Sequence, residues 1–483
     1  MIKKTASLVA LMVSAAMTVP SAASNNLELP DIGTAAAGTL TIAQEQIYGD
    51  AYMRMLRSGK PIISDPLLNE YVTSLGHRLV ANASDVKTPF NFFLIQDREI
   101  NAFAFFGGYI ALHSGLFLHA NSESELASVM SHEIAHVTQR HLARGMEEEA
   151  RRSPATIAAL AGSLLLAVAA PQAGIAAVTA TTAGAMQSSI NYTRSNEREA
   201  DRIGIVTLAK SGFEVNAMPR FFGRLAEQYR YTSTPPAMLL THPLPQERIS
   251  DSRNRAQSYP EKTLKPSINY HLAKARIVAR YAGIDAEAAM DWFDRRLKKK
   301  SEQLNPTYQY GKALVYLDNR ELDKAESLLL ELQKQDPLNT FYLDALSDLY
   351  IYKEQPQQAA KLLNNALEKK PNNPVITVNY ANALIEADQF KQALSVLQRY
   401  THQHPDDVVG WQLMADANGK MSNSAENLAA NGEIFALRAN WNKALQNFTQ
   451  ASQLAGLGSL EQARYDARID QLMVQRDRFL ALQ

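Results

Sequence analysis

A 34-residue period in the C-terminal half of the chain limits the possible folds most strongly. The period is marked by X-Pro pairs spaced 31, 34 and 34 residues apart, which end in Pro306, Pro337, Pro371 and Pro405. A small residue recurs in phase at Ala325, Ala359 and Ala393. A helix–turn–helix unit of this length buries its apolar face only against the next unit. Residues 266–483 are therefore expected to form an α-solenoid, which follows a separate first domain at 24–265.

This period, with its small alanine and terminal proline, is the tetratricopeptide pattern. Segments 270–283 and 286–297 look like an earlier, atypical helix pair, and 441–455 restores the pattern near the end. Stacked repeats offer a concave surface, so the array is expected to bind a protein partner. Trp411 and Trp441 are expected to pack between helices rather than contact that partner.

The first 23 residues are typical of an export signal rather than of a folded domain. Lys3 and Lys4 precede a short apolar run, and a group of small residues ends at Ala23. This order predicts a secretory signal peptide, 1–23, cleaved after Ala23; the alternative is an uncleaved N-terminal anchor. The chain has no cysteine, so a metal must be held by His, Asp or Glu. Its 49 basic and 49 acidic residues balance, which argues against nucleic-acid binding.

The first domain is expected to be α+β, mainly helical with a small β-sheet. Two helices and then two strands are predicted at 41–59, 66–83, 90–95 and 109–114. Gly107-Gly108 predicts a turn between the strands. Segment 101–113 is interpreted either as a sheet edge that accepts an extended substrate or as ordinary sheet. A long helix then begins at a capping box, Ser122 with Glu125, and continues without a helix breaker to Met146.

Residues 153–193 contain no Asp, Glu, Lys, Arg or His, and they are rich in Ala and Gly. Pro171 divides this stretch. A membrane span needs about 20 strongly apolar residues, to which Ala and Gly contribute little. We therefore expect a soluble helical hairpin packed on the preceding long helix. Peripheral membrane contact is the alternative, and a true membrane span is the least favoured reading.

Residues 132–136 read His-Glu-Ile-Ala-His within the predicted long helix. Helical residues four apart differ by about 40° in azimuth, so His132 and His136 project from one face and can share a metal ion. Glu133 lies about 100° further round and reaches the side of that metal. This is the arrangement of zinc peptidases, in which the glutamate acts as general base. The alternative is a polar patch on an ordinary helix.

A third metal ligand is expected from an acid on another helix, and 197–201 reads Glu-Arg-Glu-Ala-Asp. Glu197 and Asp201 share a helical face, whereas Glu199 points in roughly the opposite direction. Glu197 is therefore predicted as ligand, and Asp201 as the carboxylate that orients a ligand histidine. The alternative is a solvated acidic face. On a continuous helix His141 stands about 140° from His136, so it is expected at the surface. His113 is expected to be packed or solvent-facing.

Four segments together resemble one family. They are NAFAFFGG at 101–108, HEIAH at 132–136, EREAD at 197–201 and THP at 241–243. The set is similar to the zinc endopeptidases related to the CAAX prenyl proteases. The resemblance implies one zinc ion per chain, bound by His132, His136 and Glu197, with Glu133 as general base. Other members of that family carry several strongly apolar membrane spans, and the lack of such spans in this chain favours the soluble branch.

The order of signal peptide, peptidase and repeats resembles the periplasmic members of that family. This implies quality control of outer-membrane β-barrel proteins by proteolysis and by assisting their assembly. The implied partners are misfolded or stalled outer-membrane proteins and the β-barrel assembly machinery. A second hypothesis is a chaperone or adaptor in which proteolysis is minor or latent. A third, a pseudo-enzyme with structural zinc, is disfavoured because a structural site does not require Glu133.

His242, within the THP segment, is predicted to approach the zinc ion. There it either stabilises the oxyanion of the tetrahedral intermediate or occupies the open metal position. The remaining alternative is a loop histidine without a metal role. Arg248, six residues further on, is a candidate partner for a carbonyl or a carboxylate.

Overall fold

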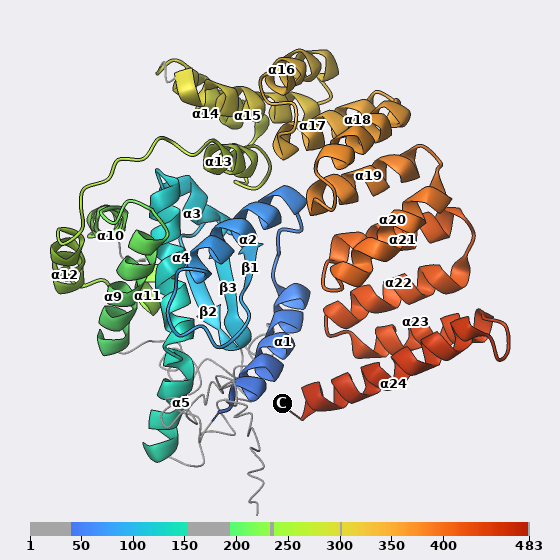
Figure 1. Ribbon diagram of the computed structural model, residues 1–483, viewed down its shortest axis with the longest axis horizontal. Coiled ribbons are helices and arrows are strands. Elements are labelled where there is room, and N and C mark those ends of the chain that lie inside the picture. Colours follow the sequence, from blue (N-terminus) through green and yellow to red (C-terminus); the bar gives the residue numbers. More distant parts are fainter. Residues whose placement is uncertain (1–39, 153–193, 232–235, 300–301, 482–483) are drawn as a thin grey trace, which may run out of the picture.

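The computed structural model describes residues 40–152, 194–231, 236–299 and 302–481, which are coloured in Figure 1. The expected signal peptide, 1–23, and the expected hairpin, 153–193, lie outside these residues. The described part is mainly helical with one small β-sheet, as the sequence predicts. None of its helices combines the length and apolarity that a membrane crossing requires.

The sheet has three strands, β1 (Asn91–Ile95), β2 (Ala102–Phe105) and β3 (Tyr109–His113), in the order β1-β3-β2. Strand β1 runs parallel to β3, and β2 runs antiparallel to it. The two predicted strands are therefore present, and the segment between them adds β2 and a short 3-10 turn. Gly108 in this turn has φ 77°, and a Cβ there would lie 1.9 Å from the Pro89 carbonyl oxygen. The edge strand β2 falls within the segment considered as a sheet edge.

Helices of the first domain surround this sheet (Figure 1). They are α1 (Ile42–Gly59), α2 (Pro66–Val80), α3 (Ser114–His119), α4 (Glu123–Thr138), α5 (His141–Arg152), α9 (Arg194–Lys210), α10 (Ala217–Gln228), α11 (Ala237–Thr241) and α12 (Gln246–Ala256). The predicted capping box at α4 is only half formed. The Ser122 side chain accepts from the Glu125 N–H, but the Glu125 carboxylate accepts from Asn121 and pairs with Arg224.

The expected uninterrupted helix from Glu125 to Met146 is wrong, because the chain breaks between α4 and α5. Arg140 has φ 52°, in the left-handed region, which ends the regular helical path. Its buried guanidinium donates to Glu45 Oε1 on α1 at 2.9 Å and to the Leu40 carbonyl oxygen at 2.5 Å. These contacts, with residues about a hundred positions away, hold the break in place.

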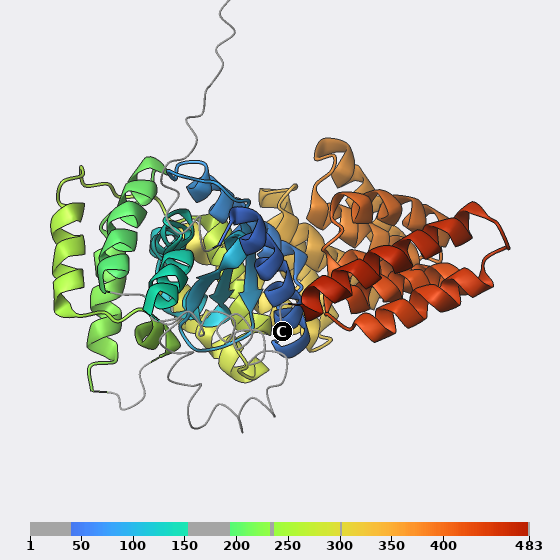
Figure 2. The same cartoon turned by 90° about the horizontal axis from the view of Figure 1, so that it is seen from below.

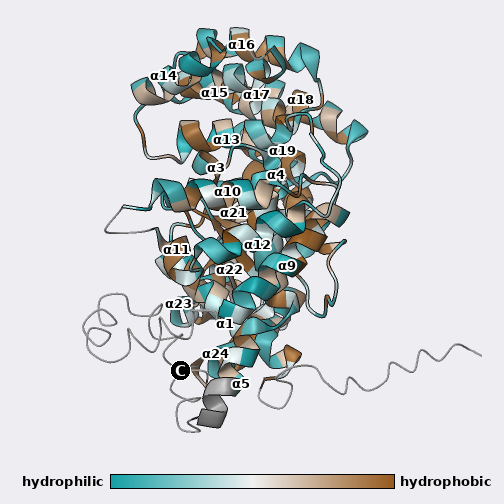
Figure 3. Ribbon diagram, turned by 90° about the vertical axis from the view of Figure 1, so that its left-hand side faces the viewer, coloured by the Kyte–Doolittle hydropathy of each residue, from teal (hydrophilic) through white to brown (hydrophobic). Residues whose placement is uncertain are grey.

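The repeat array contains the predicted helical hairpins, with an atypical first pair. Its helices are α13 (Ile268–Arg280), α14 (Ala286–Leu297), α15 (Asn305–Asp318), α16 (Leu322–Gln335), α17 (Thr340–Tyr352), α18 (Pro356–Lys369), α19 (Pro374–Glu386), α20 (Phe390–Gln403), α21 (Val408–Lys420), α22 (Ser424–Leu437), α23 (Trp441–Leu454) and α24 (Leu460–Leu480), with a 3-10 turn at Glu302–Leu304. Helices α21 and α22 form one more hairpin than the sequence pattern indicated. Hydrophilic and hydrophobic residues alternate along the helices, as expected for helices that bury one side (Figure 3).

The array curves round the first domain and contacts it at several places along its length (Figures 1 and 2). Near its start, Arg276 lies between Asp65 at 2.6 Å and Asp344 at 2.7 Å, and all three are buried. Near its end, Trp441 packs in one apolar cluster with Met55 of α1, which agrees with the predicted packing role of this tryptophan. The predicted domain division near residue 265 falls between α12 and α13, where one continuous core crosses it.

Candidate metal centre

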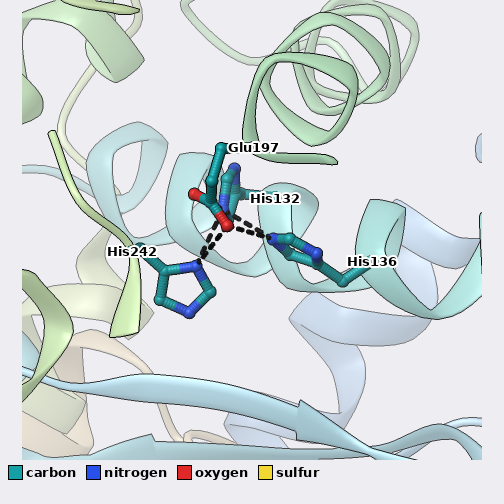
Figure 4. A group of neighbouring side chains, drawn as sticks. All are labelled: His132, His136, Glu197 and His242. Atoms are coloured by element: carbon teal, nitrogen blue, oxygen red, sulfur yellow. Dashed lines mark hydrogen bonds and ion pairs between the residues drawn. The ribbon is translucent and has the colours of Figure 1, made fainter. Parts of the chain in front are cut away.

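Four side chains converge beside the sheet (Figure 4). His132 and His136 come from α4, Glu197 from α9, and His242 from the segment after α11. One ligand atom from each lies within 4.8 Å of the others, and all four residues are buried. The structure therefore brings together the three predicted ligands and the histidine predicted to approach them.

Four of the six distances between these atoms are close to those around a small tetrahedral cation, and all six are within 4.8 Å. His132 Nε2 lies 3.0 Å from His136 Nε2 and 3.4 Å from His242 Nδ1. Glu197 Oε1 lies 3.3 Å from His136 Nε2 and 3.0 Å from His242 Nδ1. Metal–ligand bonds of about 2.0–2.1 Å in a tetrahedron place ligand atoms about 3.3–3.4 Å apart. Nitrogen and carboxylate donors at this spacing suit a divalent metal ion such as zinc.

Close packing of α9 on α4 sets this spacing. Gly204 faces the metal-binding turn of α4, and a Cβ at this position would lie 3.2 Å from the backbone nitrogen of His132 and from the Ser131 carbonyl oxygen. Because Gly204 has no side chain, the backbones of α9 and α4 can approach closely. This approach brings Glu197 of α9 within reach of the two histidines of α4. The helical periodicity of α4 supplies two donors, and the close approach of α9 supplies the third.

Two charged residues, Asp201 and Arg248, contact the proposed ligands His132 and Glu197. Asp201 Oδ1 lies 2.9 Å from His132 Nδ1, so it can fix this ring with Nε2 turned towards the metal position. Arg248 makes two 2.8 Å hydrogen bonds to the Asp201 carboxylate and lies 2.6 Å from Glu197 Oε2. It also donates to the Pro243 carbonyl oxygen at 2.7 Å, which ties the THP segment to α9. Arg248, only a weak candidate in the sequence, is thus a central contact of the site.

Burial and neighbouring charges move the pKa values of these groups in opposite directions. Burial disfavours protonation of His132, but Asp201 and Glu197 outweigh it and raise the His132 pKa to about 10. For His136, burial dominates and holds the pKa well below its usual value. Burial would raise the Glu197 pKa, but the surrounding histidines keep it well below the usual range. Without a metal the site therefore carries an ionised glutamate and a protonated His132, and a metal cation can replace that proton.

Glu133 differs from every other carboxylate in the centre. Its side chain is fully buried, and neither carboxylate oxygen has a hydrogen-bond partner among the described residues. His242 Nε2 lies 3.6 Å from Glu133 Oε1. A buried carboxylate without hydrogen bonds is costly and calls for a functional explanation. Its place beside the ligand cluster fits a group that acts on a water molecule or substrate held by the metal.

The expected surface position of His141 is wrong. Its side chain is fully buried, and its Nδ1 lies 2.8 Å from Nδ1 of His136. The error follows from the broken helix, because an azimuth of 140° holds only if α4 continues through residue 141. Glu199, predicted to point away from the ligands, contacts His141 Nε2 at 3.2 Å and Arg144 at 2.9 Å. His113 is buried 3.7 Å from Asp97 and takes no part in the cluster.

This fold and site define a metallopeptidase joined to a helical-repeat array, and comparison with known proteins agrees. The model of peptidase family M48 matches residues 66–256, and a tetratricopeptide-repeat model matches 350–417. A β-barrel assembly-enhancing protease of Escherichia coli (strain K12) is 46% identical over 98% of this chain and 97% of its own. A Vibrio cholerae protein that provisionally carries the same name is 68% identical over 97% of each chain. The metalloprotease LoiP of Escherichia coli (strain K12) is 26% identical over 45% of this chain and 83% of its own.

The chain therefore belongs to peptidase family M48, in the group of the β-barrel assembly-enhancing proteases, and is a metalloendopeptidase. The relatives of this group match it over nearly their whole length, repeat array included. The likeness stated from HEIAH, EREAD and THP thus led to the right family.

Proposed function

We propose that this protein is a periplasmic zinc endopeptidase that degrades misassembled outer-membrane β-barrel proteins and assists their assembly. The observation that carries the proposal is the placement of the unbonded, fully buried Glu133 carboxylate beside four converging ligand atoms. The name of the relatives supports the substrate class and the compartment. One zinc ion per chain would be held by His132, His136 and Glu197.

In this proposal the residues of α4 and α9 divide the chemistry between them. Zinc, when bound, supplies Lewis acidity towards a water molecule and a peptide carbonyl. Glu133 takes the proton of the attacking water and returns it to the nitrogen of the leaving amine. Asp201 holds His132 in the tautomer whose Nε2 faces the metal position, and Arg248 balances the charge of Asp201 and Glu197.

We further propose that His242 closes the site at rest. Its Nδ1 lies 3.0 Å from Glu197 Oε1 and 3.4 Å from His132 Nε2, which are ligand-to-ligand distances. A catalytic zinc site needs an open fourth position. His242→Ala would therefore raise peptidase activity if the residue blocks this position. A loss of activity would instead favour the oxyanion role, and unchanged activity would exclude both.

Strand β2 is the proposed substrate edge. Among the residues that the structure describes, β2 pairs with β3 on one side only, whereas β1, at the other end of the sheet, meets Ile62 through a bridge at Ile95. An edge strand recognises extended chains through backbone hydrogen bonds and excludes strands already paired in a sheet. This selectivity suits an enzyme that removes β-barrel proteins before their strands have paired.

The repeat array is proposed to bind these substrates or the assembly machinery. The same array supports a second candidate function, a chaperone or adaptor whose proteolytic site is latent. The short distances from His242 Nδ1 to Glu197 Oε1 and His132 Nε2 are the observation that favours latency. The two functions differ in one respect, because an adaptor retains its effect on barrel assembly when Glu133 is replaced.

The test uses the chain from residue 24 onwards, with Glu133→Gln and Glu99→Gln as paired variants. Glu99 is exposed and lies outside the ligand cluster, so its replacement controls for loss of one carboxylate. Zinc is measured by mass spectrometry and cleavage by release of peptides from unfolded casein and an unfolded outer-membrane protein. About one zinc in all three proteins, with cleavage lost only in Glu133→Gln, is expected. Equal cleavage by Glu133→Gln and the parent would overturn the proposal.

A further inference from the structure

His141 and Glu199 lie behind the metal ligand His136, in a position that the general-base mechanism does not use. His136 turns Nε2 towards the ligand cluster, 3.0 Å from His132 Nε2, and Nδ1 towards His141. His141 in turn places Nε2 3.2 Å from Glu199 Oε2. The two rings are tilted by 76° with centroids 4.8 Å apart, so they meet edge to face rather than by stacking.

The hydrogen positions in this series of contacts follow from the Glu199 carboxylate at one end. A carboxylate accepts and does not donate, so His141 Nε2 carries the proton shared with Glu199. In a neutral His141 ring Nδ1 is then an acceptor, and the 2.8 Å contact is a hydrogen bond donated by His136 Nδ1. His136 with its proton on Nδ1 has its lone pair on Nε2, which is the atom that faces the metal position. This arrangement of neutral rings satisfies both the His136–His141 and the His141–Glu199 contact.

We propose that His141 and Glu199 form a relay that fixes the tautomer and ring orientation of His136, and so sets how tightly the site holds its metal. Both are positioning residues, since neither reaches the ligand cluster. The proposal rests on the proposed zinc site and adds to it a determinant of metal affinity. His132 receives the same support directly, because Asp201 lies 2.9 Å from its Nδ1.

The surroundings of the relay make it rigid. The His141 side chain is fully buried, and Glu199 is anchored by Arg144 at 2.9 Å on the same helix as His141. His141 reaches this place only because the chain turns at Arg140, whose guanidinium is held by Glu45 of α1. Carboxylates that act through a ligand histidine change metal affinity by about 10–100-fold when they are removed.

The test measures zinc dissociation constants by competition with a chelating indicator for the parent chain, His141→Phe, Glu199→Gln and the double variant. Phenylalanine provides an aromatic ring without the two nitrogens of histidine. His271→Phe is the matched control, because His271 is a half-buried histidine packed on Tyr270 in α13, outside the metal centre. The visible spectrum of the cobalt-substituted proteins reports ligand geometry, and unfolding of the metal-free proteins reports stability.

We expect zinc to bind about 10–100-fold more weakly to His141→Phe, with an altered cobalt spectrum, and at unchanged strength to His271→Phe. Because Glu199 acts only through His141, the double variant should bind zinc no more weakly than His141→Phe alone. Affinity of His141→Phe within twofold of the parent, or losses that multiply in the double variant, would overturn the relay. A parent chain that binds no zinc would instead overturn the proposed function, so the two failures are distinguishable.

Discussion

Arg248 offers the most direct test of how charge is balanced around the metal centre. It is buried on α12 and reaches α9, where it makes two 2.8 Å hydrogen bonds to Asp201 and lies 2.6 Å from Glu197. Arg248→Met keeps an unbranched side chain but removes every donor. Two buried carboxylates then lose their cation, and the Pro243 carbonyl loses its hydrogen bond.

The loss of stability expected for Arg248→Met follows from the burial of these charges. Breaking a buried ion pair from one side costs about 3–5 kcal/mol, because the remaining charge stays in a poorly solvated place. For a unit of the size of the peptidase domain this corresponds to a fall in Tm on the order of 10 °C. Calorimetry in the presence of a chelator measures this fall without a contribution from bound metal. Because the chain has two parts, the transition that includes α9 and α12 is the relevant one.

The same two helices carry their own control. Arg198 on α9 pairs with Glu247 on α12 at 3.0 Å, but the two side chains are 53% and 74% exposed. An exposed pair of this kind contributes at most about 1 kcal/mol, so Arg198→Met should shift the Tm by no more than a few degrees. If Arg248→Met unfolds within about 2 °C of the parent, or if both variants shift equally, Arg248 does not stabilise the two buried carboxylates in the way proposed.

Three further predictions concern the metal, the helix contact and the domain junction. Zinc binding should release about one proton near pH 7, because Asp201 and Glu197 raise the His132 pKa to about 10 and its Nε2 must be deprotonated to bind zinc. Calorimetry in buffers of different ionisation enthalpy measures this release, and a release of no protons would show that the expectation is wrong. Gly204→Val should separate α9 from α4 and lower zinc content after dialysis. Gly223→Val should retain zinc, because an added Cβ at this helical glycine would meet no other element of the described chain within 4 Å; equal retention would contradict the close-packing argument. Arg276→Met should cost about 3–5 kcal/mol by leaving two buried aspartates without their cation, and calorimetry showing a loss below about 1 kcal/mol would refute this.

The grouping of the proposed ligands on two helical faces was predictable, because each face follows from local periodicity. Four-residue spacing on one helix aligns His132 with His136, and the same spacing on another helix aligns Glu197 with Asp201. The orientation of the two helices was not predictable from spacing. It depends on Gly204, an unremarkable residue in the sequence whose missing side chain allows the two backbones to meet.

The environment of His136 could not be predicted, because a distant contact determines the local path of the chain. Nothing in residues 138–142 breaks a helix by its own propensity, and Arg140 is a good helix former. The left-handed turn at Arg140 is stabilised by Glu45, which lies 95 residues earlier and is known as its partner only from the structure. The pair Arg140-His141, after the HEIAH segment, was the only hint of this turn in the sequence. It can be interpreted only when the position of α1 is known.

The same reasoning applies to the repeat array, whose period predicts contacts between neighbouring hairpins and nothing further. Its return to the first domain depends on α1, where Arg54 donates to the Ala436 carbonyl oxygen at 2.8 Å and Met55 packs in one cluster with Trp441. Helix α1 also carries Glu45, which holds the turn at Arg140. One helix of the first domain therefore contacts both the end of the array and the turn that brings His141 to His136. A substitution in α1 should accordingly affect both the packing of the array end and the turn at Arg140. This coupling could not be predicted from the repeat period or from the HEIAH motif.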